Sequence, residues 1–123
     1  MKKILVSDNA SFTRVKMAKF LSEEGFDVLL AESGQMAVEM YQSFLPDIVF
    51  MDLSDAGEDH FSSVKKITEI NPNANVIMLS SIGQEPDLLD AIKTGAKDFV
   101  MKPINKLSLF YKIHNLLAAI RIL

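Results

Sequence analysis

The fold of this chain is decided by the stretch Ile48-Val49-Phe50-Met51-Asp52, in which four consecutive apolar residues end in an acid. A continuous apolar run is typical of a strand that is covered on both faces, as in a parallel sheet. Four further short runs of the same kind occupy residues 4–6, 28–30, 76–79 and 99–101. The sequence therefore predicts five buried strands.

Segments with apolar residues at helical spacing separate these runs. The first expected stripe comprises Phe12, Val15, Ala18 and Leu21 with Ser22, and the last comprises Leu107, Phe110, Ile113, Leu117 and Ile120. Strand and helix thus alternate five times. This predicts an α/β fold, a doubly wound (βα)5 sandwich with a five-stranded parallel sheet, right-handed crossovers and helices on both faces. No linker or low-complexity tract divides residues 1–123, so we expect one domain.

Composition excludes several classes of protein. The chain has 123 residues, no cysteine, 13 basic and 16 acidic residues, and a formal net charge of −3. Disulfides and cysteine-bound metals are excluded, and the lack of a basic excess argues against direct nucleic-acid binding. No apolar run approaches the roughly 18 residues of a membrane span, and the N-terminal run ends at Val6, too early for an export signal. We expect a cytoplasmic protein without membrane contact.

Polar side chains follow four of the five expected strands. Asp8 and Asn9 follow the first strand, Asp52 ends the third, Ser80 ends the fourth, and Lys102 follows the fifth. Each has an ordinary structural explanation when it is taken alone: a helix cap, a turn or a solvated lysine. Because ligands of doubly wound sheets bind beyond the carboxyl ends of the strands, the joint pattern predicts a functional site at that edge.

Four segments together resemble the receiver domains of two-component response regulators, the CheY-like family. They are residues 3–9, 46–53, 95–100 and 101–103, and they fall in order on the expected elements. The resemblance covers the whole chain and implies the flavodoxin-like strand order 2-1-3-4-5.

The resemblance implies that Asp52 accepts a phosphoryl group from a sensor histidine kinase. Lys102 would pair with the phosphoryl oxygens as a point charge, and Ser80 would donate its hydroxyl to them. Phe99 stands at the family's aromatic switch position, which turns inward when Ser80 moves. The chain would then be a regulatory switch that promotes its own phosphorylation and dephosphorylation, and not an enzyme with an external substrate.

The resemblance also implies a Mg²⁺ site formed by Asp8, Asn9, Asp52 and the backbone carbonyl of Ser54. Most family members carry a second acid where this chain has Asn9, and an amide ligates without charge, so we expect weak Mg²⁺ binding. The loop after Asp52 also lacks the family's usual proline. One hypothesis is that an acid of this loop partly restores the lost charge; the alternative is a solvated acidic loop. The acids concerned are Asp55, Glu58 and Asp59.

The fifth expected helix has a wide apolar arc, because Leu109, Leu116 and Leu123 extend its stripe. One interpretation is a well-buried edge of the domain. The other is a contact face, shared with the fourth helix and the fifth strand, for a downstream protein target, an output domain or a second copy of the chain.

Two alternative functions stay open. A degenerate pseudo-receiver would act as an interaction module without phosphorylation, as Asn9 and the altered loop suggest. A flavin carrier on the same strand order would need a phosphate-binding loop rich in glycine and hydroxyls after the first strand. Residues 8–12 contain no glycine and begin with an acid, which argues against the flavin carrier.

Overall fold

The computed structural model describes residues 2–55 and 61–122, except for the side chains of residue 55 and residues 119–122. Strands and helices alternate along the chain, as the sequence predicts. The elements are β1 (Lys3–Ser7), α1 (Ser11–Glu23), β2 (Asp27–Ala31), α2 (Gly34–Phe44), β3 (Ile48–Asp52), the short 3₁₀ helix η1 (Leu53–Asp55), α3 (Ser62–Ile70), β4 (Val76–Ser80), α4 (Glu85–Thr94), β5 (Asp98–Met101) and α5 (Lys106–Ile122).

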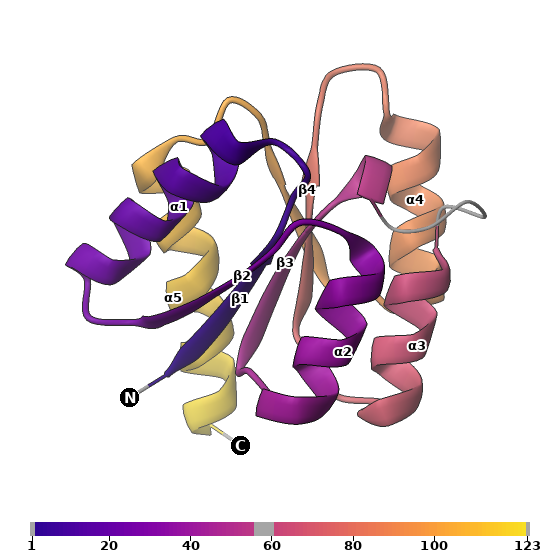
Figure 1. Ribbon diagram of the computed structural model, residues 1–123, viewed down its shortest axis with the longest axis horizontal. Coiled ribbons are helices and arrows are strands. Elements are labelled where there is room, and N and C mark those ends of the chain that lie inside the picture. The colour runs from indigo at the N-terminus through magenta and orange to yellow at the C-terminus, as the bar shows by residue number, and fades with distance from the viewer. Residues whose placement is uncertain (1, 56–60, 123) are drawn as a thin grey trace.

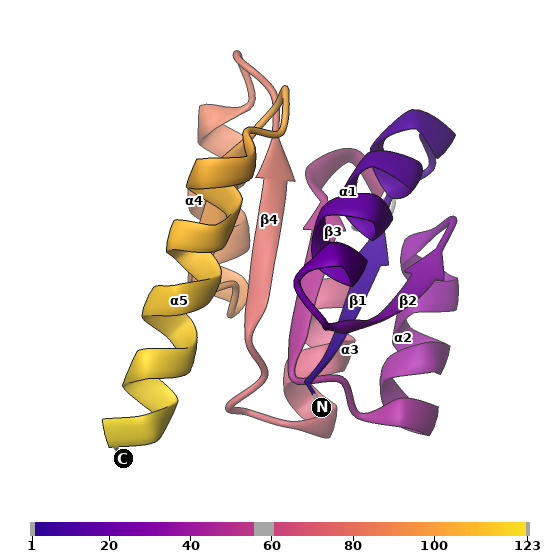
Figure 2. The same ribbon diagram turned by 90° about the vertical axis from the view of Figure 1, so that its left-hand side faces the viewer.

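The five strands form one parallel sheet in the order β2-β1-β3-β4-β5. Helices α1 and α5 cover one face of the sheet, and α2, α3 and α4 cover the other (Figure 1). Figure 2 shows the molecule from the side of α1 and α5, with both chain ends at the same end of the sheet. The α/β fold class, the parallel sheet and the strand order are therefore confirmed.

The central strand β3 explains why its sequence is apolar without interruption. All five of its residues are buried. Ile48 and Phe50 pack in the core beneath α1 and α5, whereas Val49 and Met51 pack beneath α2, α3 and α4. Alternate side chains thus enter two different cores, so that no position of the strand meets water.

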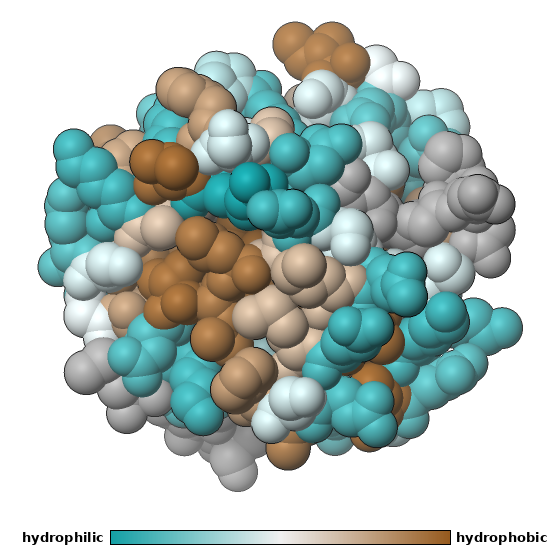
Figure 3. Space-filling model, in the orientation of Figure 1, coloured by the Kyte–Doolittle hydropathy of each residue, from teal (hydrophilic) through white to brown (hydrophobic). Residues whose placement is uncertain are grey.

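The prediction of five buried strands is wrong for the two edge strands, β2 and β5, which are only partly covered. Leu30 of β2 is 40% exposed, and Figure 3 shows apolar side chains gathered over this strand on the face seen in Figure 1. Within the part of the chain that the structure describes, no helix combines the length and the apolar character needed to cross a membrane.

The predicted stripe of α1 is confirmed at Leu21 but wrong at Phe12 and Val15, and it missed Met17. The helix buries Thr13, Met17 and Leu21, whereas Phe12 is 75% exposed and Val15 is 67% exposed. Met17 and Leu21 pack against the sheet four residues apart, and this spacing brings Thr13 inward one turn earlier. The expected stripe was drawn through Phe12 and Val15, which lie on the exposed side of the helix.

The predicted stripe of α5 is wrong at Leu107 but confirmed at Ile113, and Phe110 and Leu117 pack against the same core. Leu107 is 82% exposed, whereas Leu109 and Ile113 are buried and Phe110 is half-buried. The first turn of α5 follows Asn105, whose side-chain oxygen accepts a hydrogen bond from the backbone N–H of Ser108 at 3.1 Å. This capping residue sets where the helix begins.

The wide apolar arc of α5 is partly explained by burial. Leu109 is fully buried, and Leu116 packs against the same core. Both therefore fit the well-buried edge better than an outward contact face. Leu123, as well as the side chain of Ile120, lies outside the described part of the chain.

Candidate functional site

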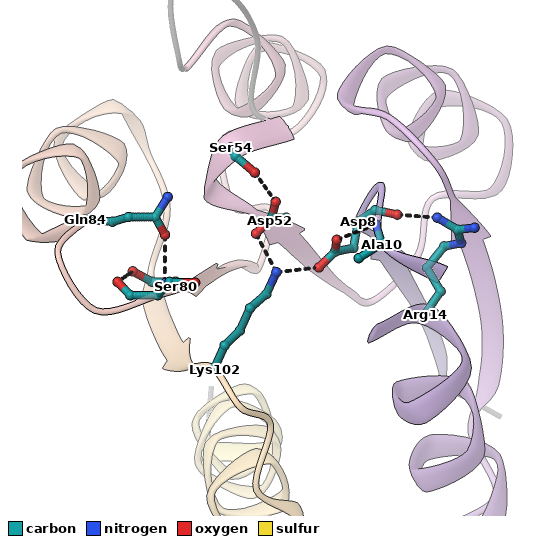
Figure 4. A network of polar contacts seen from close by, with 9 residues as sticks. Asp8, Ala10, Arg14, Asp52, Ser54, Ser80, Gln84 and Lys102 are labelled. Atoms are coloured by element: carbon teal, nitrogen blue, oxygen red, sulfur yellow. Dashed lines mark hydrogen bonds and ion pairs between the residues drawn. The ribbon is translucent and has the colours of Figure 1, made fainter. Parts of the chain in front are cut away.

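The carboxyl ends of four strands bring polar side chains to one edge of the sheet. Asp52 is the last residue of β3 and Ser80 the last of β4, while Asp8 and Lys102 directly follow β1 and β5. Figure 4 shows the side chains of Asp8, Asp52 and Lys102 pointing toward one another, with Ser80 beside them. The expectation that these strand ends meet is confirmed by this arrangement.

Lys102 bridges the two carboxylates. Its Nζ lies 2.8 Å from Asp8 Oδ2 and 2.8 Å from Asp52 Oδ1. The side chains of Asp8 and Asp52 are 0% and 6% exposed, and that of Lys102 is 23% exposed. Two buried carboxylates at such short range repel each other, so the ammonium between them offsets both the repulsion and the loss of hydration.

The same bridge alters the titration of Lys102. Burial lowers the pKa of its ammonium, but the hydrogen bonds and the Coulomb attraction of Asp52 and Asp8 outweigh this effect. The net result is a pKa above the ordinary value of 10.5. Lys102 is therefore a stable positive charge at neutral pH.

The turn after β1 fixes Asp8 through several contacts. Asp8 N donates to Ala31 O at 3.1 Å, and Asp8 Oδ1 accepts from the backbone N–H of Ala10 at 2.9 Å. Arg14 Nη1 donates to the backbone carbonyl of Asp8 at 2.6 Å. Apart from its ion pair with the ammonium, Asp8 Oδ2 accepts no hydrogen bond from the described residues. Among the described residues, the ammonium of Lys102 is thus the partner of this buried carboxylate oxygen.

Two contacts of this site were missed from the sequence. Arg14 lies one turn into α1 with its side chain 15% exposed, and it also faces Glu32 at 3.9 Å. The hydroxyl of Ser54 donates to Asp52 Oδ2, whereas the resemblance had implied only its backbone carbonyl. Neither residue type is distinctive at its position, and both contacts depend on the direction of a side chain within a turn or helix.

Ser80 is buried, and its hydroxyl is hydrogen-bonded within its own loop. It is 1% exposed, and its hydroxyl donates to the carbonyl of Ser81 at 3.3 Å. The backbone N–H of Ser81 in turn donates to Gln84 Oε1 at 2.7 Å (Figure 4). In this arrangement the hydroxyl of Ser80 lies at the edge of the site, turned toward its own loop.

Phe99 is half-buried on β5 and packs against the core beneath α2, α3 and α4. Lys112 Nζ lies 5.1 Å from the centroid of its ring. Asp98 Oδ1 accepts from Lys112 Nζ at 2.9 Å and from the backbone N–H of Phe99 at 2.8 Å. The aromatic side chain is therefore held between the core and α5.

The donor set fits a hard divalent cation. The buried carboxylates of Asp8 and Asp52 supply charged oxygens, and the carbonyl of Ser54 and the exposed Asn9 follow them in the chain. Mg²⁺ usually takes one or two protein carboxylates and completes its octahedron with other oxygens and water. Among the described residues, no group of three or more His, Cys, Asp and Glu side chains forms a metal cluster.

The hypothesis on the acidic loop concerns residues beyond this description. Glu58 and Asp59, like the side chain of Asp55, lie outside the described residues.

A pocket of about 350 Å³ adjoins the site on the side of α1. It is lined mainly by apolar groups and by two lysines, namely Phe12, Thr13, Lys16, Lys102, Pro103 and Ile104. A larger pocket of about 540 Å³ lies between the N-terminal ends of α2 and α3, and its lining includes neither of the two buried carboxylates nor the bridging lysine. Of these two pockets, the smaller one adjoins the site, because Lys102 is part of its lining.

Comparison with known proteins places the chain in a family. The sequence model of the response regulator receiver domain matches residues 4–114. The chain is 41% identical over 102 residues to the chemotaxis protein CheY of Bacillus subtilis (strain 168), covering 82% of this chain and 85% of that protein. It is 39% identical over 103 residues to the chemotaxis protein CheY of Thermotoga maritima, covering 83% and 86%. A crystal structure of a response regulator receiver domain protein from Clostridium thermocellum superposes with a TM-score of 0.90 at 25% identity, over 99% of this chain and 98% of that chain. The chain therefore belongs to the response regulator receiver domain family of two-component signalling.

Proposed function

We propose that this chain is a phosphorylation-dependent receiver in which Asp52 accepts a phosphoryl group from a sensor histidine kinase. The observation that carries the proposal is the bridge of Lys102 between Asp52 and Asp8, at 2.8 Å from each. It combines a buried carboxylate nucleophile with a positive charge at the carboxyl ends of the strands. An anionic acceptor and an anionic donor need such a charge in order to approach each other.

The chain's own residues would carry the transfer. An oxygen of Asp52 forms a bond to phosphorus while the bond from phosphorus to the kinase's histidine nitrogen breaks, and the electron pair leaves with the imidazole. Lys102 then pairs with the phosphoryl oxygens, and the hydroxyl of Ser80 turns from its own loop to donate to them. The same groups would assist attack by water and so limit the lifetime of the phosphorylated state.

Asp8, Asn9, Asp52 and the carbonyl of Ser54 would hold Mg²⁺. When bound, Mg²⁺ neutralises part of the phosphoryl charge. Asn9 contributes an oxygen without charge, and this is the specific observation that favours the second candidate, a pseudo-receiver that binds partners without phosphorylation.

Phosphorylation would be sensed by a partner at the face formed by α4, β5 and α5. Movement of Ser80 leaves room for Phe99 to turn inward and thereby changes that face for a downstream protein target, an output domain or a second copy of the chain. The pocket beside Lys102, rimmed by the exposed Phe12, offers the kinase an apolar contact near the acceptor. A cytoplasmic location and a single receiver domain over residues 1–123 are part of this proposal.

Intact-mass spectrometry tests the function directly. The protein is incubated with acetyl phosphate and millimolar Mg²⁺, and we expect a gain of one phosphoryl group. Asp52→Asn should lose the gain. Asp47→Asn is the matched control, because Asp47 lies at the opposite end of β3 and accepts from the backbone N–H of Lys3; it should keep the gain. An unchanged mass of the parent protein would favour the pseudo-receiver.

A further inference from the structure

Both oxygens of the Asp52 carboxylate accept hydrogen bonds. Lys102 Nζ donates to Oδ1 at 2.8 Å, and Ser54 Oγ donates to Oδ2. Ser54 lies in η1, which begins directly after Asp52 and turns the chain so that the serine side chain points back to the carboxylate (Figure 4). The acceptor is thus held from two sides.

The two hydrogen-bond donors, Lys102 and Ser54, differ in how easily each can break its bond to Asp52. Lys102 is also tied to Asp8 at 2.8 Å and is largely buried. Ser54 is exposed, so water can replace Asp52 as the partner of its hydroxyl when the side chain rotates. Asp52, in contrast, is 4% exposed and has little water of its own. The hydroxyl of Ser54 therefore supplies a contact that solvent does not supply.

A carboxylate oxygen that accepts a hydrogen bond has a lone pair engaged, and it is a weaker ligand and nucleophile for that reason. We propose that Ser54 is a positioning residue whose hydroxyl occupies Asp52 Oδ2 in the resting state and competes there with the divalent cation and the incoming phosphoryl group. The inference rests on the proposed function of Asp52. The serine keeps its proton throughout: its hydroxyl rotates away while the new bond from Asp52 to phosphorus forms and the bond to the donor's leaving group breaks.

Two variants separate the hydroxyl from the space it fills. Ser54→Ala removes the donor, and Ser54→Thr, the matched control, retains it. We expect Ser54→Ala to be phosphorylated by acetyl phosphate about threefold to tenfold faster than the parent, with acetate as the leaving group. We also expect it to bind Mg²⁺ more tightly by a similar factor, as measured by shifts of backbone amide NMR signals without any phosphodonor. Ser54→Thr should behave like the parent in both assays.

The Mg²⁺ titration and the phosphorylation assay distinguish failure of the role of Ser54 from failure of the proposed function. Unchanged or weaker Mg²⁺ binding in Ser54→Ala, or an equal gain in Ser54→Thr, would overturn the role of the hydroxyl. Slower phosphorylation of Ser54→Ala would overturn it as well. If neither the parent nor the variants accept a phosphoryl group, the proposed function fails, and the Mg²⁺ titration alone still decides whether Ser54 competes for Asp52.

Discussion

Lys112 on α5 holds its ammonium group 5.1 Å from the centroid of the Phe99 ring on β5. The same ammonium lies 2.9 Å from Asp98 Oδ1, and this oxygen also accepts the backbone N–H of Phe99. One carboxylate thus fixes both the strand that carries the ring and the cation above it. The contact joins Phe99 on β5 to α5.

Replacement of Lys112 should release this ring. Lys112→Met removes the ion pair and the cation–π contact but keeps most of the apolar stem. Because both charged side chains are partly exposed, we expect a loss of less than about 1 kcal/mol in the free energy of unfolding. In NMR spectra of the unphosphorylated protein, the ring signals of Phe99 should move toward their positions in the parent with beryllofluoride.

Lys106→Met is the matched control for this experiment. Lys106 lies on the same helix, with its ammonium 5.8 Å from the ring of Phe20 instead, so the ring signals of Phe99 should not change. Identical Phe99 signals in Lys112→Met and the parent would show that the ammonium does not hold the ring.

Lys102 should give the stability of the protein a distinctive dependence on pH. Its pKa in the folded protein lies above the ordinary 10.5, so its stabilising contribution is fully present below pH 10.5 and is lost as the pH rises through the folded-state pKa. Lys102→Met should lower the free energy of unfolding by about 1–3 kcal/mol at neutral pH. The difference from the parent should shrink in urea titrations above about pH 10.5.

Lys19→Met controls for the general effect of losing a lysine, because Lys19 is exposed on α1. Its difference from the parent should be small and nearly independent of pH. A Lys102→Met difference that stays constant above the ordinary lysine range would contradict the bridge as the cause.

The sequence predicted the inner strands of the sheet because a strand that is buried on both faces consists mainly of apolar residues. In β3 every position from Ile48 to Asp52 is buried, and the first four of these residues are apolar. This continuous run is the pattern that predicted a strand covered on both faces. The meeting of Asp8, Asp52 and Lys102 was predictable for a related reason. The carboxyl ends of parallel strands necessarily share one edge.

The contacts that the sequence did not predict depend on the direction in which a side chain points, and composition does not determine that direction. In α1, Phe12 and Val15 are apolar but point outward, and the phase of the helix is set by Met17 and Leu21 against the sheet. A shift of one residue turns a helix by about 100°, so a stripe drawn through Phe12 and Val15 falls on the exposed side of the helix. The contact of the Ser54 hydroxyl with Asp52 was not predicted for the same reason, because it depends on how η1 turns the side chain of Ser54.

The observed phase of α1 can be tested by truncation to alanine on its buried and its exposed side. Met17→Ala should lower the free energy of unfolding by about 2–5 kcal/mol, because it leaves a cavity in the core beneath α1 and α5. Val15→Ala should change it by less than about 0.5 kcal/mol, because Val15 is exposed. Urea denaturation monitored by circular dichroism measures both, and similar losses in the two variants would contradict the observed phase.

Asn9 allows the charge of the site to be changed by a single atom. Asn9→Asp adds a third carboxylate directly after Asp8 in the chain, and Asp8 already shares one ammonium with Asp52. Without metal, the added repulsion should lower the unfolding temperature. With Mg²⁺ the added charge should tighten binding on the order of tenfold, because charged ligands raise the affinity for a hard cation. The unfolding temperature of Asn9→Asp should therefore rise more steeply with Mg²⁺ concentration than that of the parent.

A remote acid separates this local effect from net charge. Asn73→Asp places the same charge in the exposed turn before β4, at the amino end of the sheet. Its Mg²⁺ response should match that of the parent at equal ionic strength. If Asn9→Asp bound Mg²⁺ no more tightly than Asn73→Asp, then Asn9 would not lie within ligand distance of the cation. The expected weak binding of Mg²⁺ would then need another explanation than the missing charge at residue 9. The expected contrast between the two variants follows from geometry, since only Asn9 directly follows the buried Asp8 at the edge where Asp52 and Lys102 meet.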